Sequence, residues 1–129
     1  MRARQARQIL RADSLVDLGL ALLLLLAWWE GPYEALGLPV PRPPVFAGLA
    51  GVLLLGFAYL LWVAPDYTVL GRRVAEAAAI VNGLAASVIL LWLATGPAGL
   101  RPLGVAITLL IGVAKAAFAV LEVRLASAP

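Results

Sequence analysis

Four long apolar stretches constrain the fold of this chain more than any other feature of its sequence. They cover residues 14–29, 45–63, 74–94 and 103–123. A helix needs roughly 20 apolar residues to cross a bilayer, and the last three stretches come close to that length. The first is shorter, although residues 8–12 can extend it toward the N-terminus. The sequence therefore predicts an all-α membrane protein in which four transmembrane helices form an antiparallel bundle.

The composition supports a membrane protein and leaves no length for a second domain. Of the 129 residues, 64% are hydrophobic and only 13% are charged, and the mean hydropathy is +0.99. A soluble domain has about a quarter of its residues charged. The connections contain helix breakers such as Gly31-Pro32, Pro65 and Gly96-Pro97. We therefore expect residues 1–129 to form one transmembrane domain, with residues 1–13 as a basic cytoplasmic segment.

The arginines are distributed unevenly between the two sides that this topology defines. Seven lie on the side of the termini and two on the opposite side, and basic residues usually remain in the cytoplasm. Both termini are therefore expected to be cytoplasmic, in a cell (plasma or inner) membrane. The seven are Arg2, Arg4, Arg7, Arg11, Arg72, Arg73 and Arg124, and the two are Arg42 and Arg101. Since topology explains these charges, the net charge of +3 does not indicate a nucleic-acid partner.

The two halves of the chain share a pattern that predicts an internal repeat. The order Gly-Leu-Ala, an apolar run, tryptophan and Gly-Pro occurs once from Gly19 and again from Gly83. Each unit contains two of the predicted helices, so both units would enter the membrane in the same orientation, as a parallel 2+2 repeat. The alternative is that two leucine-rich helices align by chance.

Small residues recur at every fourth position of the third and fourth apolar stretches. This spacing lets the backbones of two membrane helices approach closely. These two helices are therefore predicted to be the closest pair, led by Gly83 and Gly112. The predicted helix-packing positions are Ala75, Ala79 and Gly83 on one stretch and Gly104 and Gly112 on the other.

Lys115 stands near the middle of the last apolar stretch, where a charged group costs about 3 kcal/mol even on the insertion scale. We therefore expect its side chain to face the other helices and to meet a carboxylate. Asp17 is the first candidate, Asn82 lies at nearly the same depth, and Glu122 and Glu76 lie nearer the cytoplasm. These five residues are the candidates for binding a ligand or coupling to an ion.

Each of the five also has a structural interpretation. Asp17 completes a capping box with Ser14, and Glu76 lies in a first helical turn near a basic residue. The other three have general structural roles, which are interhelical hydrogen bonding for Asn82, an interfacial position for Glu122 and an ion pair for Lys115. The sequence leaves these interpretations open beside the functional ones.

The residues for common catalytic and metal chemistry are missing, because the sequence contains no cysteine and no histidine. Disulfides, thiol catalysis and cysteine ligation are thereby excluded. Zinc enzymes, haem proteins with a histidine ligand and serine–histidine hydrolases usually depend on histidine, which this chain lacks. No catalytic residue, metal site or cofactor is evident, so an enzyme is the least favoured class. A lipid or a quinone is the ligand class that fits the surroundings.

These features together resemble the small bacterial membrane proteins of the DoxX type. The resemblance is carried by four short helices, cytoplasmic termini, a Pro-rich first outer loop ending in Leu36-Gly-Leu-Pro39, and a Gly-x-x-Lys element from Gly112 to Lys115. In that group the Gly-x-x-Lys element is more familiar in the first helix. The resemblance implies a four-helix membrane fold and, for some members, an accessory role in quinone-linked redox systems. It implies no catalytic residue here.

The sequence thus favours a non-enzymatic membrane component, which acts as a subunit, an accessory factor or a scaffold for a lipid or another hydrophobic ligand. The alternative is a small transporter or channel that uses the site of Lys115 and its carboxylates. Such a transporter is expected to be an oligomer, because four helices enclose little space for a path. The expected partners are the lipid bilayer and either further copies of the chain or a larger membrane complex.

Overall fold

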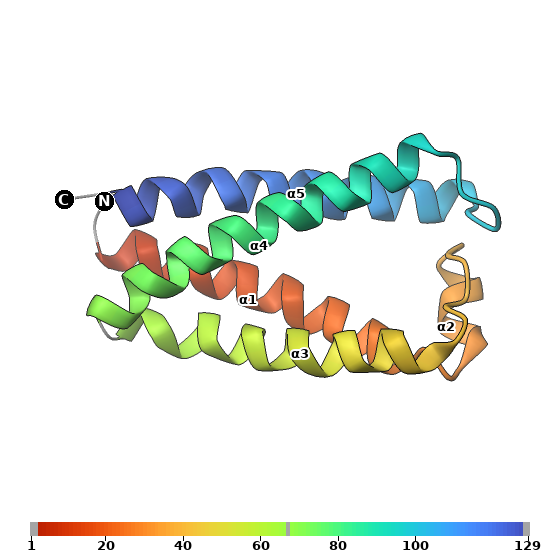
Figure 1. Cartoon of the computed structure of the whole chain (residues 1–129), viewed down its shortest axis with the longest axis horizontal. Helices are drawn as coiled ribbons and strands as arrows, with labels where there is room; N and C mark the ends of the chain where they lie inside the picture. Colours follow the sequence, from red (N-terminus) through yellow and green to blue (C-terminus); the bar gives the residue numbers. More distant parts are fainter. Residues whose placement is uncertain (1–2, 67, 128–129) are drawn as a thin grey trace.

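The computed structural model describes residues 3–66 and 68–127, and these residues form helices and no strands. The helices are α1 (Ala3–Leu25), α2 (Glu30–Ala35), α3 (Pro44–Val63), the short 3-10 helix η1 (Ala64–Asp66), α4 (Thr68–Ala94) and α5 (Pro102–Ser127). Figure 1 shows the four long helices extended along the long axis of the molecule. The start of α1 and the end of α5 lie at one end, and α2 lies at the other.

Three of the long helices have the length and composition of membrane spans. These segments are Pro44–Asp66, Thr68–Ala94 and Pro102–Ser127. The predicted helical and membrane character is therefore confirmed at this level. α1 is not among the three, because every 18-residue window within it contains Arg11, Asp13 and Asp17.

The observed helices extend beyond the apolar stretches that predicted them. α1 begins at Ala3 and ends at Leu25, so the predicted bounds of 14–29 are wrong and residues 3–13 are helical rather than a separate segment. No proline or glycine interrupts residues 3–13, and a helix continues through polar residues as long as its backbone hydrogen bonds can form. α4 likewise begins at residue 68 rather than 74, despite Gly71 within the added turns, and α5 ends at residue 127 rather than 123.

The connection after α1, predicted to be a loop, contains the short helix α2. Pro32 lies in the first turn of α2, where the missing N–H of a proline leaves no helical hydrogen bond unmade. Tyr33 is buried, and its hydroxyl donates a hydrogen bond to the Leu23 carbonyl at 2.7 Å. This bond fastens α2 to the last part of α1.

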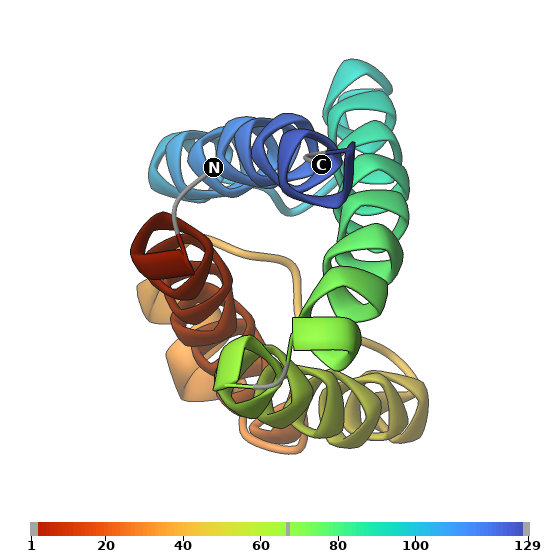
Figure 2. The ribbon, with the colours of Figure 1, turned by 90° about the vertical axis from the view of Figure 1, so that its left-hand side faces the viewer.

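The long helices pack mainly as two pairs, α1 with α3 and α4 with α5. Figure 2, seen along the long axis, shows the members of each pair side by side. A Cβ atom added at Gly51 of α3 would lie 3.0 Å from the Ala21 carbonyl oxygen of α1. A Cβ atom added at Gly112 of α5 would lie 3.1 Å from side-chain atoms of both Ile89 and Leu90 of α4. These two glycines therefore allow the close approach within each pair.

The contact between α4 and α5 is the most extensive between described helices, as predicted, but Gly83 does not lead it. The neighbour of a Cβ atom added at Gly83 is the Cβ of Ala119 at 3.9 Å, an ordinary contact. Ser87, the next position in the four-residue series, is exposed. The buried positions of α4 are Val74, Ala75, Ala78, Ala79, Asn82 and Ala86. A step of four residues overshoots the helical turn of about 3.6 residues, so a strict series rotates away from the buried face.

Gly104 was predicted to support packing between the long helices, but it faces the segment after α2. A Cβ atom added at Gly104 would overlap the carbonyl of Gly37. The Gly37 carbonyl also accepts a hydrogen bond from the Arg101 N–H at 2.9 Å. Gly37 has a φ of 68°, a conformation that glycine adopts without steric cost. These contacts join the two helix pairs at the end of the molecule that carries α2.

Candidate functional site: a buried polar cluster and an apolar groove

Five polar side chains from three helices meet inside the molecule, and we call this group the polar cluster. Its members are Asp13 and Asp17 of α1, Asn82 of α4, and Lys115 and Glu122 of α5. Lys115 is 3% exposed and the other four are 0% exposed. Polar groups removed from water are costly unless they are hydrogen-bonded. The contacts among these five side chains are therefore central to how the helices fit together.

Helical periodicity places the members of the cluster on the correct faces. Asp13 and Asp17 are four residues apart, and residues at this spacing share one face of a helix. Lys115 and Glu122 are seven residues apart, which is close to two helical turns. Asn82 lies on the buried face of α4, which it shares with alanines such as Ala78, Ala79 and Ala86. Its amide therefore reaches both α1 and α5.

The Lys115 ammonium pairs with both aspartates of α1. Its Nζ lies 2.9 Å from Asp13 Oδ1 and also contacts Asp17 Oδ1. Two carboxyl groups on successive turns of α1 thus hold one ammonium group of α5. This contact explains how an apolar helix accommodates a lysine, because a buried charge requires a paired and hydrogen-bonded partner.

The Asn82 amide connects the carboxyl groups of Asp13 and Glu122. Its Nδ2 donates one hydrogen bond to Asp13 Oδ2 at 2.7 Å and another to Glu122 Oε2 at 2.8 Å. An amide nitrogen has two hydrogens, so both donors of Asn82 are used. Asp13 is consequently bound on one oxygen by Lys115 and on the other by Asn82. Glu122 is held next to Asp13 by the shared nitrogen.

Three buried acceptor atoms of the cluster have no hydrogen-bond partner among the described residues. They are Asp17 Oδ2, Asn82 Oδ1 and Glu122 Oε1. The cluster also contains three carboxyl groups and a single ammonium group. The protein itself therefore supplies fewer donors and less positive charge than these carboxyl groups require.

The structure brings together four of the five residues that the sequence analysis selected, namely Asp17, Asn82, Lys115 and Glu122. Their roles in binding or coupling stay predictions. Asp13 was missed, because residues 1–13 were assigned to a segment before the first helix. A signal was present, since Asp13 precedes Asp17 by one helical turn, and a longer first helix would have placed both on one face.

Glu76 lies outside the polar cluster, and its role as a candidate stays a prediction. Its carboxyl group pairs with Arg73 at 2.9 Å and with Arg72 at 3.8 Å, and its side chain is 38% exposed. Glu76 is the ninth residue of α4, so the prediction that it lies in a first helical turn is wrong. The predicted ion pair with a nearby basic residue describes the observed contacts.

The interpretation of Ser14 and Asp17 as a capping box is also wrong. Ser14 and Asp17 lie in the middle of α1, so they do not form a capping box at its start. The Ser14 hydroxyl instead donates a hydrogen bond to the Ala58 carbonyl of α3 at 2.6 Å. Glu122 is completely buried among the helices, and its predicted interfacial depth stays a prediction.

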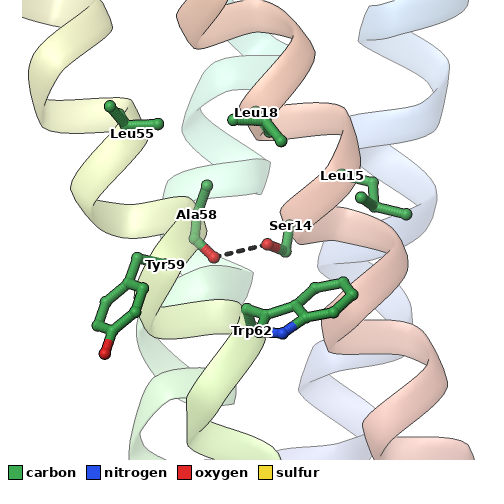
Figure 3. Close-up of a pocket in the computed structure, with 7 residues that line it drawn as sticks. All are labelled: Ser14, Leu15, Leu18, Leu55, Ala58, Tyr59 and Trp62. Carbon is green, nitrogen blue, oxygen red and sulfur yellow. Dashed lines mark hydrogen bonds between the residues drawn. The ribbon is translucent and has the colours of Figure 1, made fainter.

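An apolar groove lies between α1 and α3, on another face of α1 from the two aspartates. It has a volume of about 420 Å³. Its lining residues are Ser14, Leu15 and Leu18 of α1 and Leu55, Ala58, Tyr59 and Trp62 of α3. Figure 3 shows these side chains around the hydrogen bond from Ser14 to Ala58, with the Trp62 indole extending from α3 toward α1. Leu15, Tyr59 and Trp62 are exposed, so the groove opens onto the surface of the protein.

Two arginines lie near the end of the groove that Trp62 occupies. The Arg11 guanidinium stands over the Trp62 ring, 4.9 Å from its centroid. Arg11 Nη2 lies 3.3 Å from Asp66 Oδ2, and Arg7 Nη2 lies 3.0 Å from Asp66 Oδ1. Two guanidinium groups thus share one carboxylate, which leaves net positive charge beside the groove.

Within the described residues, no group of three histidine, cysteine, aspartate or glutamate side chains is placed to hold a metal ion. Comparison of the chain with protein-family models, with curated proteins and with solved structures found no match. The features of the molecule that indicate a function are therefore the polar cluster, the groove and the arginines beside it.

Proposed function

We propose that this chain is a small integral membrane protein that works as a non-enzymatic scaffold for a lipid, alone or as an accessory subunit of a larger complex. The observation that carries the proposal is the apolar groove of about 420 Å³ between α1 and α3. In a membrane such a groove faces the acyl chains of lipids. All four long helices are proposed to cross the bilayer as an antiparallel bundle.

The two faces of α1 support its role as the fourth span. Its aspartates are buried against Lys115, whereas Leu15, Leu18 and Leu22 are exposed. Charged residues inside membranes usually face the protein interior and pair there, so α1 presents an apolar surface to lipid despite its composition. The arginine bias continues to favour cytoplasmic termini. Reporter fusions at the C-terminus and near Pro41 test this orientation, and a periplasmic C-terminus would contradict it.

The groove suits a hydrocarbon chain better than a quinone ring. A quinone presents two carbonyl oxygens that need hydrogen-bond donors when they are buried. The Ser14 hydroxyl already donates to Ala58, so it offers no free donor to a ligand. The remaining polar groups of the lining are the Tyr59 hydroxyl and the Trp62 indole N–H, and both belong to exposed side chains. An acyl chain needs only apolar contact, which these side chains supply.

The charges beside the groove favour an anionic lipid headgroup. Arg7 and Arg11 share Asp66, and Arg11 contacts Trp62 in the wall of the groove. Basic side chains at the membrane surface attract anionic lipids. We therefore propose that the occupant is an anionic phospholipid whose acyl chain lies along Leu18 and Leu55 and whose phosphate lies near Arg11.

Fluorescence quenching by brominated lipids tests this proposal. A variant that keeps Trp62, with Trp28, Trp29 and Trp92 changed to phenylalanine, is reconstituted in bilayers with equal fractions of brominated anionic or brominated zwitterionic phospholipid. Stronger quenching of Trp62 by the anionic lipid supports the proposal. In that background Arg11→Gln should remove the difference.

The matched control is a variant that keeps only Trp92, which lies on α4 away from the groove. Its quenching should not distinguish the two lipids. If Trp62 itself responds equally to both lipids, the proposed headgroup preference is wrong. If neither lipid quenches Trp62 above the level of the Trp92 control, no lipid is retained in the groove and the scaffold proposal fails.

A second candidate, an oligomeric transporter or channel, is favoured by the polar cluster. Its three unpartnered acceptors are buried at the meeting point of α1, α4 and α5. The test is ion flux into liposomes at increasing ratios of protein to lipid, with Asp17→Asn as the comparison. Flux that rises with protein and falls in the variant supports transport. Absence of flux at every ratio rejects it.

A further inference from the structure

We infer that the polar cluster is a proton-binding site, with the proton held on Glu122 next to Asp13. The inference concerns the site of the second candidate function, but it requires only the buried cluster and no transport. Its starting point is the imbalance of charge. Three carboxyl groups share one ammonium group in a region where every member is at most 3% exposed.

Burial makes this imbalance energetically important. If all three carboxyl groups were ionised, the cluster would carry a net charge of −2 in a region shielded from bulk solvent. Carboxyl groups in such surroundings take up protons rather than remain charged. Two carboxylates held next to each other also disfavour a second ionisation. At least one of the three is therefore expected to be neutral.

The contacts identify which carboxyl group holds the proton. Asp13 and Asp17 each contact the Lys115 ammonium, which stabilises their ionised forms. Among the described residues, Glu122 forms no ion pair with that ammonium, and its amide donor, Asn82, is shared with Asp13. Asn82 donates to Glu122 Oε2, whereas Glu122 Oε1 has no hydrogen-bond partner within the part of the chain that the structure describes. Glu122 is consequently the carboxyl group with the least compensation for a negative charge.

The unpartnered atoms support a bound proton. A hydrogen on Glu122 gives the cluster one additional donor, where the described side chains leave three acceptors unfilled. A carboxyl–carboxyl hydrogen bond to Asp13 becomes available, because the two groups are held together by the Asn82 nitrogen. A metal ion is a poorer occupant, since the described residues offer no group of three suitable ligands.

Infrared spectroscopy of the full-length chain in lipid nanodiscs tests the inference directly. Protonated carboxylic acids have a carbonyl stretch that ionised carboxylates lack. The wild-type protein should show this band at neutral pH, where exposed glutamates with pKa values of about 4.3 are ionised. Labelling the glutamates with ¹³C at the carboxyl carbon should shift the band, whereas labelling the aspartates should leave it in place. This measurement requires no substitution and so does not depend on how a variant folds.

Glu122→Gln should remove the band, because the amide keeps the shape of the side chain but has no carboxyl group. Glu34→Gln is the matched control, since Glu34 is exposed and lies on α2, and it should leave the band unchanged. Absence of the band in the wild-type protein at neutral pH would overturn the inference. A shift with labelled aspartate alone would also overturn the assignment to Glu122. Loss of the band when sodium or potassium replaces a bulky organic cation would show a metal cation in the proton's place.

Discussion

The polar cluster and the apolar groove use different faces of α1 and depend on different forces. The cluster joins the two helix pairs, because α1 of one pair meets α4 and α5 of the other through charges and hydrogen bonds. The groove lies within a single pair, where α1 and α3 meet through close backbone approach and apolar side chains. Packing between α1 and α5 is otherwise slight. The helix pairs are therefore joined by these polar contacts together with an apolar contact of Leu10 and Leu61 against the start of α4, whereas association within the α1–α3 pair depends mainly on shape.

The largest effect is expected from Lys115→Met, which leaves Asp13 and Asp17 buried without their counter-charge. Removing one member of a buried ion pair costs about 3–5 kcal/mol, whereas replacing all members by apolar groups is often neutral. The triple variant Lys115→Met, Asp13→Leu, Asp17→Leu should therefore recover most of the lost stability. Thermal unfolding in detergent measures both variants. Arg124→Met, an exposed basic position on α5, is the control. A stable Lys115→Met variant would show that the ion pairs between the helix pairs contribute little to the free energy of unfolding.

Within the α1–α3 pair, Gly51→Ala should destabilise by about 1–3 kcal/mol, because the added methyl group meets the Ala21 carbonyl at 3.0 Å and α1 must move away. The matched control is Gly56→Ala on the same helix, where nothing lies within 4 Å of the added Cβ atom. That substitution should be neutral or slightly stabilising, since alanine is the better helix former. Equal unfolding temperatures of the two variants would contradict the argument that shape holds this pair together.

Ser14→Ala should have a moderate effect, of about 0.5–1.5 kcal/mol, because the hydrogen bond to the Ala58 carbonyl is lost. The carbonyl keeps its place in α3, and the groove keeps its apolar lining. Brominated-lipid quenching of Trp62 should therefore remain close to that of the parent single-tryptophan protein. A variant with unchanged stability but no quenching would assign Ser14 a direct role in holding the ligand.

The smallest effect is expected from Glu76→Gln at the surface of α4. Exposed ion pairs such as those of Glu76 with Arg72 and Arg73 contribute about 0–1 kcal/mol, and salt screens them. Unfolding of this variant should therefore match the wild-type protein in high salt. Glu122→Gln provides the comparison, because a buried group is shielded from salt and any effect of that substitution should persist. A salt-dependent effect at Glu122 would place it in contact with water.

The helical and apolar character of this protein could be predicted from its sequence, because the properties responsible are local. Apolar length and composition identify three segments that are long and apolar enough to span a membrane, and a lysine in an apolar helix predicts a buried partner wherever the helix packs. The same local argument failed for α1. Its polar first half was predicted to be a separate segment, but it belongs to the same helix as the apolar second half. The orientation and the internal repeat stay predictions, since no contact in the structure tests them.

Only the tertiary structure decided which residues meet. Lys115 contacts Asp13 as well as the expected Asp17, Asn82 connects Asp13 to Glu122, and Glu76 pairs elsewhere. These choices depend on how far each helix extends and how it is rotated against its neighbours. A difference of about 0.4 residue per step between a four-residue series and the helical turn was sufficient to move Gly83 away from the closest contact. Rotation and depth are set jointly by all the packed helices, so the pattern of a single helix cannot determine them.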